Sequence, residues 1–341
     1  MNKKVRLEQG FDKISNLPEP ITAHILSFLP TQEAVRMSIL ATSWRALWTQ
    51  VSSLDLRCCN VPFLYAYRQP KTAIIRKRRL FYDFIDLAFE SLVILEKVKL
   101  YVPNFEPEFK PRVDNWVDGA FGFKLRMFEF ELEYLPSRKF EYELEYLPQK
   151  LPRYILPKIV FGSNWMTKLK LRNCGIKESC LSDIHLPSLC YLSLSSVCIN
   201  EKAMESLLSS CPNLEDFNFD SCYGLNKLEI LNNAKLKKTV VIIQYEHGSL
   251  PISIQAASLL EFICEYGDSV NKKGDYKIKF IGCGNMKKLK AISAPLNDLE
   301  LHSLLENLPA IESLELDRCD RLRCIDISSP HLLHLELIVK S

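Results

Sequence analysis

The sequence lacks the features typical of secreted, membrane-spanning and nucleotide-binding proteins. Its first residues contain no continuous apolar stretch of the kind a signal peptide needs, and no later run approaches the roughly 18 apolar residues of a membrane span. Gly282-Cys283-Gly284 is too short for a phosphate-binding loop, and no serine has the glycine-flanked setting of a nucleophile. The chain is therefore expected to be intracellular, in the cytoplasm or the nucleus, with no membrane partner.

The sequence also has little excess charge and few grouped metal ligands. Its 44 basic and 41 acidic residues leave a formal net charge of +3, too small a field to gather nucleic acid. His331 and His334 lie close in sequence, but no further ligand-rich cluster accompanies them. We therefore expect no catalytic residue, no metal site and no cofactor, and the sequence disfavours a nucleic-acid partner.

The sequence does contain enough apolar material for a large core. With 341 residues, of which 47% are hydrophobic, the chain has room for roughly two domains. Its 12 cysteines are better interpreted as thiols that pack as small core hydrophobes than as a disulfide framework.

Residues 12–48 form a compact helical pattern that differs from everything after it. Asn16-Leu17-Pro18-Glu19-Pro20 combines prolines, which a first helical turn tolerates, with an acid where the helix dipole favours an anion. A helix is predicted from there to Phe28-Leu29-Pro30, then a second helix capped by Thr31 and a short third helix. Such a short segment lacks an independent core, so apolar surface should remain for a partner.

In their order, residues 12–19, 25–31, 33–36 and 44–48 resemble the F-box of a large plant family. An ordinary helical bundle is the alternative, but amphipathic spacing alone does not produce this ordered combination. The resemblance implies that the segment binds a Skp-type adaptor, which links it to a cullin scaffold in a ubiquitin ligase. The residues expected to contact the adaptor are Leu17, Pro18, Ile21, Ile25, Leu26, Leu29, Val35 and Trp44.

Ala41-Thr42-Ser43 departs from the family, in which many members carry a Ser-Lys-Arg type sequence before the tryptophan. The departure removes positive charge, so we expect weaker adaptor binding rather than none. It leaves a second interpretation open, a leucine-rich-repeat scaffold that has a decayed F-box and works independently of a ligase.

Leucines then recur with the spacing leucine-x-x-leucine-x-leucine-x-x-cysteine, which is typical of leucine-rich repeats. Residues 166–174, 214–222 and 311–319 match this spacing, and residues 189–198 and 296–301 match it in part. The step between corresponding leucine slots, from Leu169 to Leu192 and on to Phe217, lies within the usual length of about 20–29 residues.

Each copy predicts a short strand with one buried face, followed by a turn at the cysteine slot. Weaker copies at residues 95–100 and 125–130 place the first repeats near residue 91, and residues 201–210 and 301–308 are predicted to be helices of the convex side. Residues 240–243 and 276–280 are plausible further strands. Cys174, Cys222 and Cys319 are expected to be buried, unpaired thiols.

The predicted fold is an α/β solenoid preceded by a small helical module. We expect a three-helix F-box at residues 11–50, a connector at 51–90, and irregular leucine-rich repeats at 91–341 that form a ribonuclease-inhibitor-like arc with an uncapped C-terminal end. The six residues from Glu131 recur from Glu143, and this local duplication is expected to form an insertion loop.

Side chains between the leucines should project onto the concave surface of the arc and hold a target protein, whose identity the sequence does not reveal. They are basic in early repeats and acidic in later ones, which favours a target of opposite polarity. The expected target-binding residues are Lys168, Lys170, Arg172, Tyr191, Asp216, Asp220, Glu300, Glu315 and Asp317.

The predicted function is that of the non-catalytic substrate receptor of a Skp-cullin-F-box ubiquitin ligase. A less favoured alternative is a nucleic-acid binder that uses Arg76-Lys77-Arg78-Arg79, although an ordinary solvated helix face is the more common meaning of such a run.

Overall fold

The protein divides into two compact units, Met1–Lys99 and Leu100–Ser341. A computed structural model describes residues 17–29, 31, 33–35, 51–57, 71–134, 154–182, 184–231, 233–244, 250–267, 278–324, 327 and 330–338. Trp44, the Ala41-Thr42-Ser43 segment and the second copy of the local duplication lie outside the described residues.

The first unit opens with the predicted helix, α1 (Glu19–Ser27). Pro18 occupies the N-cap position with an extended backbone, Pro20 lies in the first turn, and the helix ends at Phe28. Leu26, Ala34 and Val51 form a small core against which Leu29 packs. The hydroxyl of Thr31 accepts a hydrogen bond from the Asp55 backbone N–H at 2.8 Å, which joins the start of the second helix to a strand.

Two further elements of the first unit occupy the predicted connector. They are the strand β1 (Ser53–Leu56) and the long helix α4 (Lys71–Ser91). The basic run lies on α4, where Arg76, Lys77 and Arg79 are exposed and Arg78 is buried. The run is therefore not a uniform solvated face, because one of its four cations points into the protein.

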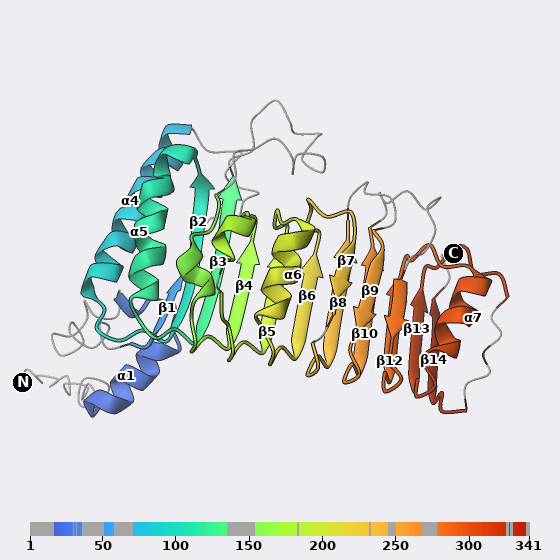
Figure 1. Ribbon diagram of the computed structural model, residues 1–341. Coiled ribbons are helices and arrows are strands. Elements are labelled where there is room, and N and C mark those ends of the chain that lie inside the picture. The colour runs from blue at the N-terminus through green and yellow to red at the C-terminus, as the bar shows by residue number, and fades with distance from the viewer. Residues whose placement is uncertain are drawn as a thin grey trace, which may run out of the picture. The chain divides into compact units, whose positions relative to one another are not determined.

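The second unit is built on a sheet whose strands stack side by side in chain order (Figure 1). Neighbouring strands from β3 to β14 are parallel, and Leu169, Leu192 and Phe217 share one register row as the repeat spacing predicts. In sheet order the strands are β2 (Lys97–Phe105), β3 (Met127–Tyr134), β4 (Lys168–Arg172), β5 (Tyr191–Ser195), β6 (Asp216–Asp220), β8 (Lys238–Ile243), β10 (Glu261–Tyr266), β12 (Lys288–Ile292), β13 (Ser313–Asp317) and β14 (His334–Ile338).

Each repeat turns sharply where its strand ends. Asn173, Ser196 and Ser221 directly follow three successive strands and adopt left-handed backbone with φ of 56°, 51° and 50°. The next residue is the predicted cysteine after β4 and β6, where Cys174 and Cys222 are buried, and it is the buried Val197 after β5. The prediction of burial is wrong for Cys319, which is half-buried. The leucines of the adjacent β14, Leu335 and Leu337, are themselves about half-exposed and give it little cover.

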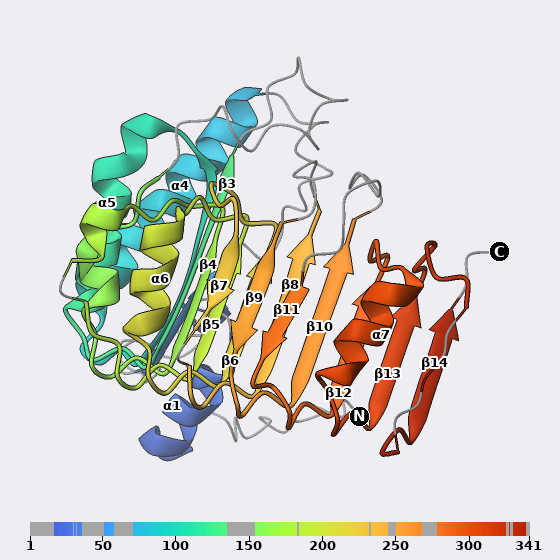
Figure 2. The same cartoon turned by 45° about the vertical axis from the view of Figure 1, so that its right-hand side comes forward.

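A second layer covers one face of this sheet (Figure 2). It contains the helices α5 (Lys110–Phe121), α6 (Glu201–Ser209) and α7 (Asp298–Glu306) and the short 3-10 helices η3 (Pro107–Phe109), η5 (Lys158–Phe161) and η6 (Glu178–Cys180). Between α6 and α7 in the chain, a three-stranded parallel sheet takes the place of helices, with the order β11 (Ile278–Ile281), β9 (Ile252–Gln255) and β7 (Leu228–Ile230).

One predicted strand is a helix. Residues 296–301 fit part of the leucine spacing, but the Asn297 side chain caps α7 by accepting a hydrogen bond from the Glu300 backbone N–H, and the Glu300 carboxylate accepts one from the Asn297 backbone N–H, both at 2.9 Å. This capping box begins the helix three residues earlier than the predicted 301–308. The strand of this repeat is β12 instead. Glu300 is therefore not a target-binding residue of the sheet, and that assignment is corrected.

No helix within the described ranges is long and apolar enough to cross a membrane.

Candidate functional site

An apolar stripe on α1 is the first candidate surface. Ile21, Ile25 and Phe28 are 49%, 39% and 75% exposed, and their spacing of four and three residues aligns them along one side of the helix and its C-cap. The His24 ring lies edge-on to Phe28, with 4.8 Å between ring centroids. Because these apolar side chains are aligned and uncovered, this side of α1 is a candidate contact surface.

The residues expected to contact the adaptor differ in their exposure. Ile21, Ile25 and Pro18 are exposed, while Leu17, Leu29 and Val35 are half-buried. Leu26 is a correction, because its side chain is 0% exposed in the small core with Ala34 and Val51 and offers no surface to a partner.

Phe28 is the residue that the sequence reasoning missed. Phe28-Leu29-Pro30 was interpreted only as the end of the helix, although Phe28 lies seven residues after Ile21 and so on the same side. That spacing was the available signal.

The second candidate surface is the face of the parallel sheet that the second layer leaves uncovered, here called the open face. Along each strand, outward side chains alternate with buried ones, as in the pattern of β4, β5 and β6. The predicted target-binding residues that lie on the open face are Lys168, Lys170, Arg172, Tyr191, Asp216, Asp220, Glu315 and Asp317.

The predicted change from basic to acidic along this face is wrong. The basic strand β4 lies beside the acidic β3, where Lys170 approaches Glu129 at 3.8 Å and Arg172 approaches Glu131 at 3.6 Å. Two later strands also carry outward lysines, Lys238 on β8 and Lys288 and Lys290 on β12. Basic and acidic strands are therefore interspersed along the face and do not form a gradient.

Tyr191 lies between the basic strand β4 and the acidic strand β6, with Lys168 and Asp216 as its register partners. The ammonium groups of Lys168 and Lys170 lie 4.3 and 5.9 Å from its ring centroid, and its hydroxyl accepts a hydrogen bond from the Asn218 side chain at 2.8 Å. These contacts hold Tyr191 and Lys168 in place on the open face.

The middle of the open face carries apolar side chains. Val240 and Ile242 on β8 and Ile263 on β10 point outward and are half-exposed, and Val240 is the register partner of Ile263. A hollow of about 310 Å³ reaches from the β3 and β4 ion pairs to Asp220, Val240 and Ile242. The sequence reasoning missed this patch because the repeat spacing does not recur between residues 235 and 282, so outward and inward positions were not assigned.

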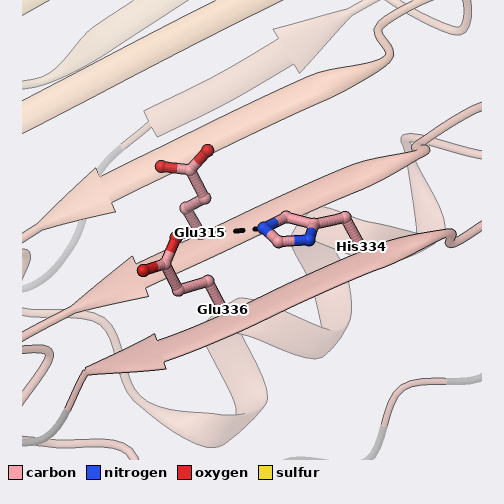
Figure 3. Close-up of side chains that lie close together, drawn as sticks. All are labelled: Glu315, His334 and Glu336. Carbon is pink, nitrogen blue, oxygen red and sulfur yellow. Dashed lines mark ion pairs between the residues drawn. The ribbon is translucent and has the colours of Figure 1, made fainter.

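The last strands bring three possible metal ligands together. Donor atoms of Glu315, His334 and Glu336 lie within 4.8 Å of one another, and His334 pairs with Glu336 at 3.8 Å (Figure 3). Lys290 already pairs with Glu315 at 2.6 Å, and this hydrogen-bonded carboxylate raises the pKa of Lys290. We therefore interpret the group as a cluster of ion pairs, in which Lys290 already pairs with one of the two carboxylates.

Comparison with known proteins gives two matches to protein-family models. One is the F-box domain, over residues 14–56, and the other is described as the LRR repeats of FBD-associated F-box protein At5g56370, over residues 140–300. The first match contains α1 and its apolar stripe. The second contains most strands of the open face.

Three relatives from Arabidopsis thaliana are similar to this chain, and the names of two of them combine an F-box with leucine-rich repeats. F-box/LRR-repeat protein At3g58940 is 30% identical over 300 residues, which are 82% of this chain and 45% of that protein. F-box/LRR-repeat protein At3g59200 is 32% identical over 211 residues, 60% of this chain and 36% of the relative. FBD-associated F-box protein At5g27750 is 30% identical over 209 residues, which are 61% of this chain and 41% of that protein. The chain thus spans less than half the length of these curated relatives.

Proposed function

Because this chain belongs to the plant F-box/leucine-rich-repeat family, we propose that it is the substrate receptor of a Skp-cullin-F-box ubiquitin ligase. In this role the F-box binds a Skp-type adaptor, and through it a cullin scaffold, while the repeats form a solenoid whose concave side, the open face, holds a target protein. The chain performs no chemistry. It raises the concentration of target lysines near a ubiquitin-charged enzyme held elsewhere on the scaffold.

The observation that carries the proposal is the uncovered apolar stripe within the residues matched by the F-box model. Ile21, Ile25 and Phe28 are held outward while Leu26, on the same helix, is in the core. A helix that presents aligned aliphatic and aromatic side chains suits a partner with a complementary groove. F-box domains typically bind Skp-type adaptors, so the stripe is the surface we assign to that contact.

Copurification of the full chain with a Skp-type adaptor tests the proposal. We expect stoichiometric recovery of the adaptor with the wild-type chain and strongly reduced recovery with Phe28→Ala, because a central aromatic anchor typically contributes about 2 kcal/mol or more. Leu80→Ala is the matched control, since Leu80 is a similarly exposed apolar residue of the same unit, on α4.

Recovery of the adaptor by the Leu80→Ala control but not by Phe28→Ala supports the receptor. Absence of the adaptor with the wild-type chain contradicts it and favours the ligase-independent scaffold. Equal recovery with Phe28→Ala and the wild type contradicts the assignment of the stripe.

A further inference from the structure

The apolar patch of the open face, Val240, Ile242 and Ile263, occupies positions that are polar on the neighbouring strands. The corresponding positions on β4, β5 and β6 carry lysine, arginine, serine, asparagine and aspartate. Nothing in the fold requires aliphatic side chains there, because the inward residues of the same strands already supply the core. Half-exposed aliphatic side chains at the centre of a polar surface are typical of a contact point.

Three carboxylates border the apolar patch. Asp216 and Asp220 lie on β6, and Glu265 lies on β10, so that Ile242 has Asp220 as register partner on one side and Glu265 on the other. Within the described part of the chain, none of the three forms an ion pair. Asp220 accepts hydrogen bonds from the hydroxyls of Ser195 and Ser221, both at 2.7 Å, which orient the carboxylate without neutralising it.

The nearby lysine does not neutralise this border either. Lys238 is the register partner of both Asp216 and Glu261, and its ammonium pairs with Glu261 at 2.9 Å. Lys288 lies beyond Glu261 on β12 and is exposed. Other carboxylates of the open face have a cation partner, as Glu129 has Lys170 and Glu315 has Lys290, whereas Glu133 on β3 has the Tyr101 hydroxyl as its partner. Asp220 and Glu265 differ from all of these because they lie directly beside an outward aliphatic side chain, Ile242.

The spacing of Asp220, Ile242 and Glu265 suits a bound side chain that carries a positive charge. Neighbouring strands lie about 4.8 Å apart, so Asp220 and Glu265 flank Ile242 from either side at roughly 10 Å from each other. One cation above Ile242 would then lie about 5 Å from each acid, inside the screening length of about 8 Å at physiological salt. The aliphatic stem of arginine or lysine packs on such a surface while its charged end reaches the carboxylates.

We propose that this patch binds a basic segment of the target protein, in which an arginine or lysine lies beside an aliphatic residue. The inference rests on the proposed function, because it assigns a chemistry to the target that the open face holds. An acidic segment is repelled by the three carboxylates, and a purely apolar segment would cover them without supplying a partner, which costs free energy.

Fluorescence anisotropy with two defined peptides tests this inference on the full chain. One labelled 12-residue peptide alternates arginine with leucine between glycine-serine ends, and its counterpart carries glutamate in place of each arginine. We expect the arginine peptide to bind and the glutamate peptide not to bind. Asp220→Asn combined with Glu265→Gln should weaken the arginine peptide about fivefold to tenfold, and flatten its salt dependence, because two exposed ion pairs are lost.

Matched variants separate this patch from general attraction to an acidic surface. Glu129→Gln combined with Glu315→Gln removes two carboxylates of the same face that already have cation partners, so it should change binding less than twofold. Ile242→Thr keeps the branched side chain but removes part of the apolar contact, and should weaken the arginine peptide without changing its salt dependence.

Equal binding of the two peptides would overturn the proposal, and so would equal losses with the Asp220/Glu265 and Glu129/Glu315 pairs. Adaptor content is measured in the same preparations and reports on the F-box separately. Loss of adaptor with intact peptide binding contradicts the ligase function alone, whereas loss of peptide binding with adaptor retained contradicts the target chemistry alone.

Discussion

Two consecutive residues of α1 should respond in opposite ways to truncation to alanine. Ile25 is 39% exposed on the apolar stripe, whereas Leu26 is 0% exposed in the small core. Fully burying a large aliphatic side chain contributes about 1.5–3 kcal/mol, so an adaptor that covers the exposed part of Ile25 gains roughly 0.6–1.2 kcal/mol from it. The void left in a packed interface adds to that loss. Ile25→Ala should therefore weaken the adaptor complex by about 1–2 kcal/mol, roughly fivefold to thirtyfold in Kd.

Leu26→Ala removes a core side chain, and such changes typically cost about 2–5 kcal/mol of folding free energy. Leu26 is the largest buried side chain of the small core that it forms with Ala34 and Val51, so α1 should unfold locally far more often without it. Ile25→Ala should leave the helix nearly as stable as in the wild type, because truncations at exposed positions usually stay within about 0.5 kcal/mol.

Two measurements on the full-length chain separate these effects. Hydrogen–deuterium exchange over residues 19–29 reports the stability of α1, and calorimetric titration with the adaptor gives Kd. We expect faster exchange in Leu26→Ala, and unchanged exchange with weaker binding in Ile25→Ala. Wild-type affinity in Ile25→Ala, or unchanged exchange in Leu26→Ala, would refute the division of α1 into a partner face and a core face.

Three further predictions concern the repeats. Burial raises the pKa of Cys211 and Cys222 to about 12, so few of these thiols are ionised near pH 8. An alkylating reagent should therefore label the exposed Cys324 before either of them, and rapid native labelling of Cys222, measured by peptide mass spectrometry, would contradict the repeat register. Asn297→Ala breaks the capping box of α7 and should destabilise the second unit by about 1 kcal/mol in denaturant titration, and an increase in stability would contradict the helix assignment. Tyr191→Leu removes the ring beneath two ammonium groups and should make Lys168 more mobile than Lys238 by side-chain NMR, with equal mobility counting against the cation–π contact.

The repeat spacing predicted the sheet well where it was regular. From Leu169 through Leu192 to Phe217, each leucine slot lies in the predicted register row, because the period-two alternation of a strand allows only one face to be buried. The spacing failed at Leu296-Asn297-Asp298, where leucines compatible with a strand also suit a helix. There the Asn297–Glu300 capping box satisfies backbone groups at the start of α7.

Charge on the open face could not be predicted in the same way. Lys170 and Glu129 lie 41 positions apart in the sequence, and they meet only because β3 and β4 are neighbours in the sheet. Basic residues in one repeat and acidic residues in another therefore suggest a gradient of charge along the face. Ion pairs between neighbouring strands show that no such gradient exists. The two acids beside Ile242 likewise come from different strands, Asp220 from β6 and Glu265 from β10, which meet only on either side of β8.

The sequence by itself determined where α1 begins and, wherever the repeat spacing is regular, which strand residues face the core, because helix caps, prolines and leucine periodicity act over a few neighbouring residues. Tertiary structure alone decided that Leu26 fills a core while Ile25 stays uncovered, and that Asp220, Ile242 and Glu265 share one row of the open face. Those outcomes depend on contacts between distant segments, in which burial and charge pairing belong to the assembled neighbours and not to any one segment.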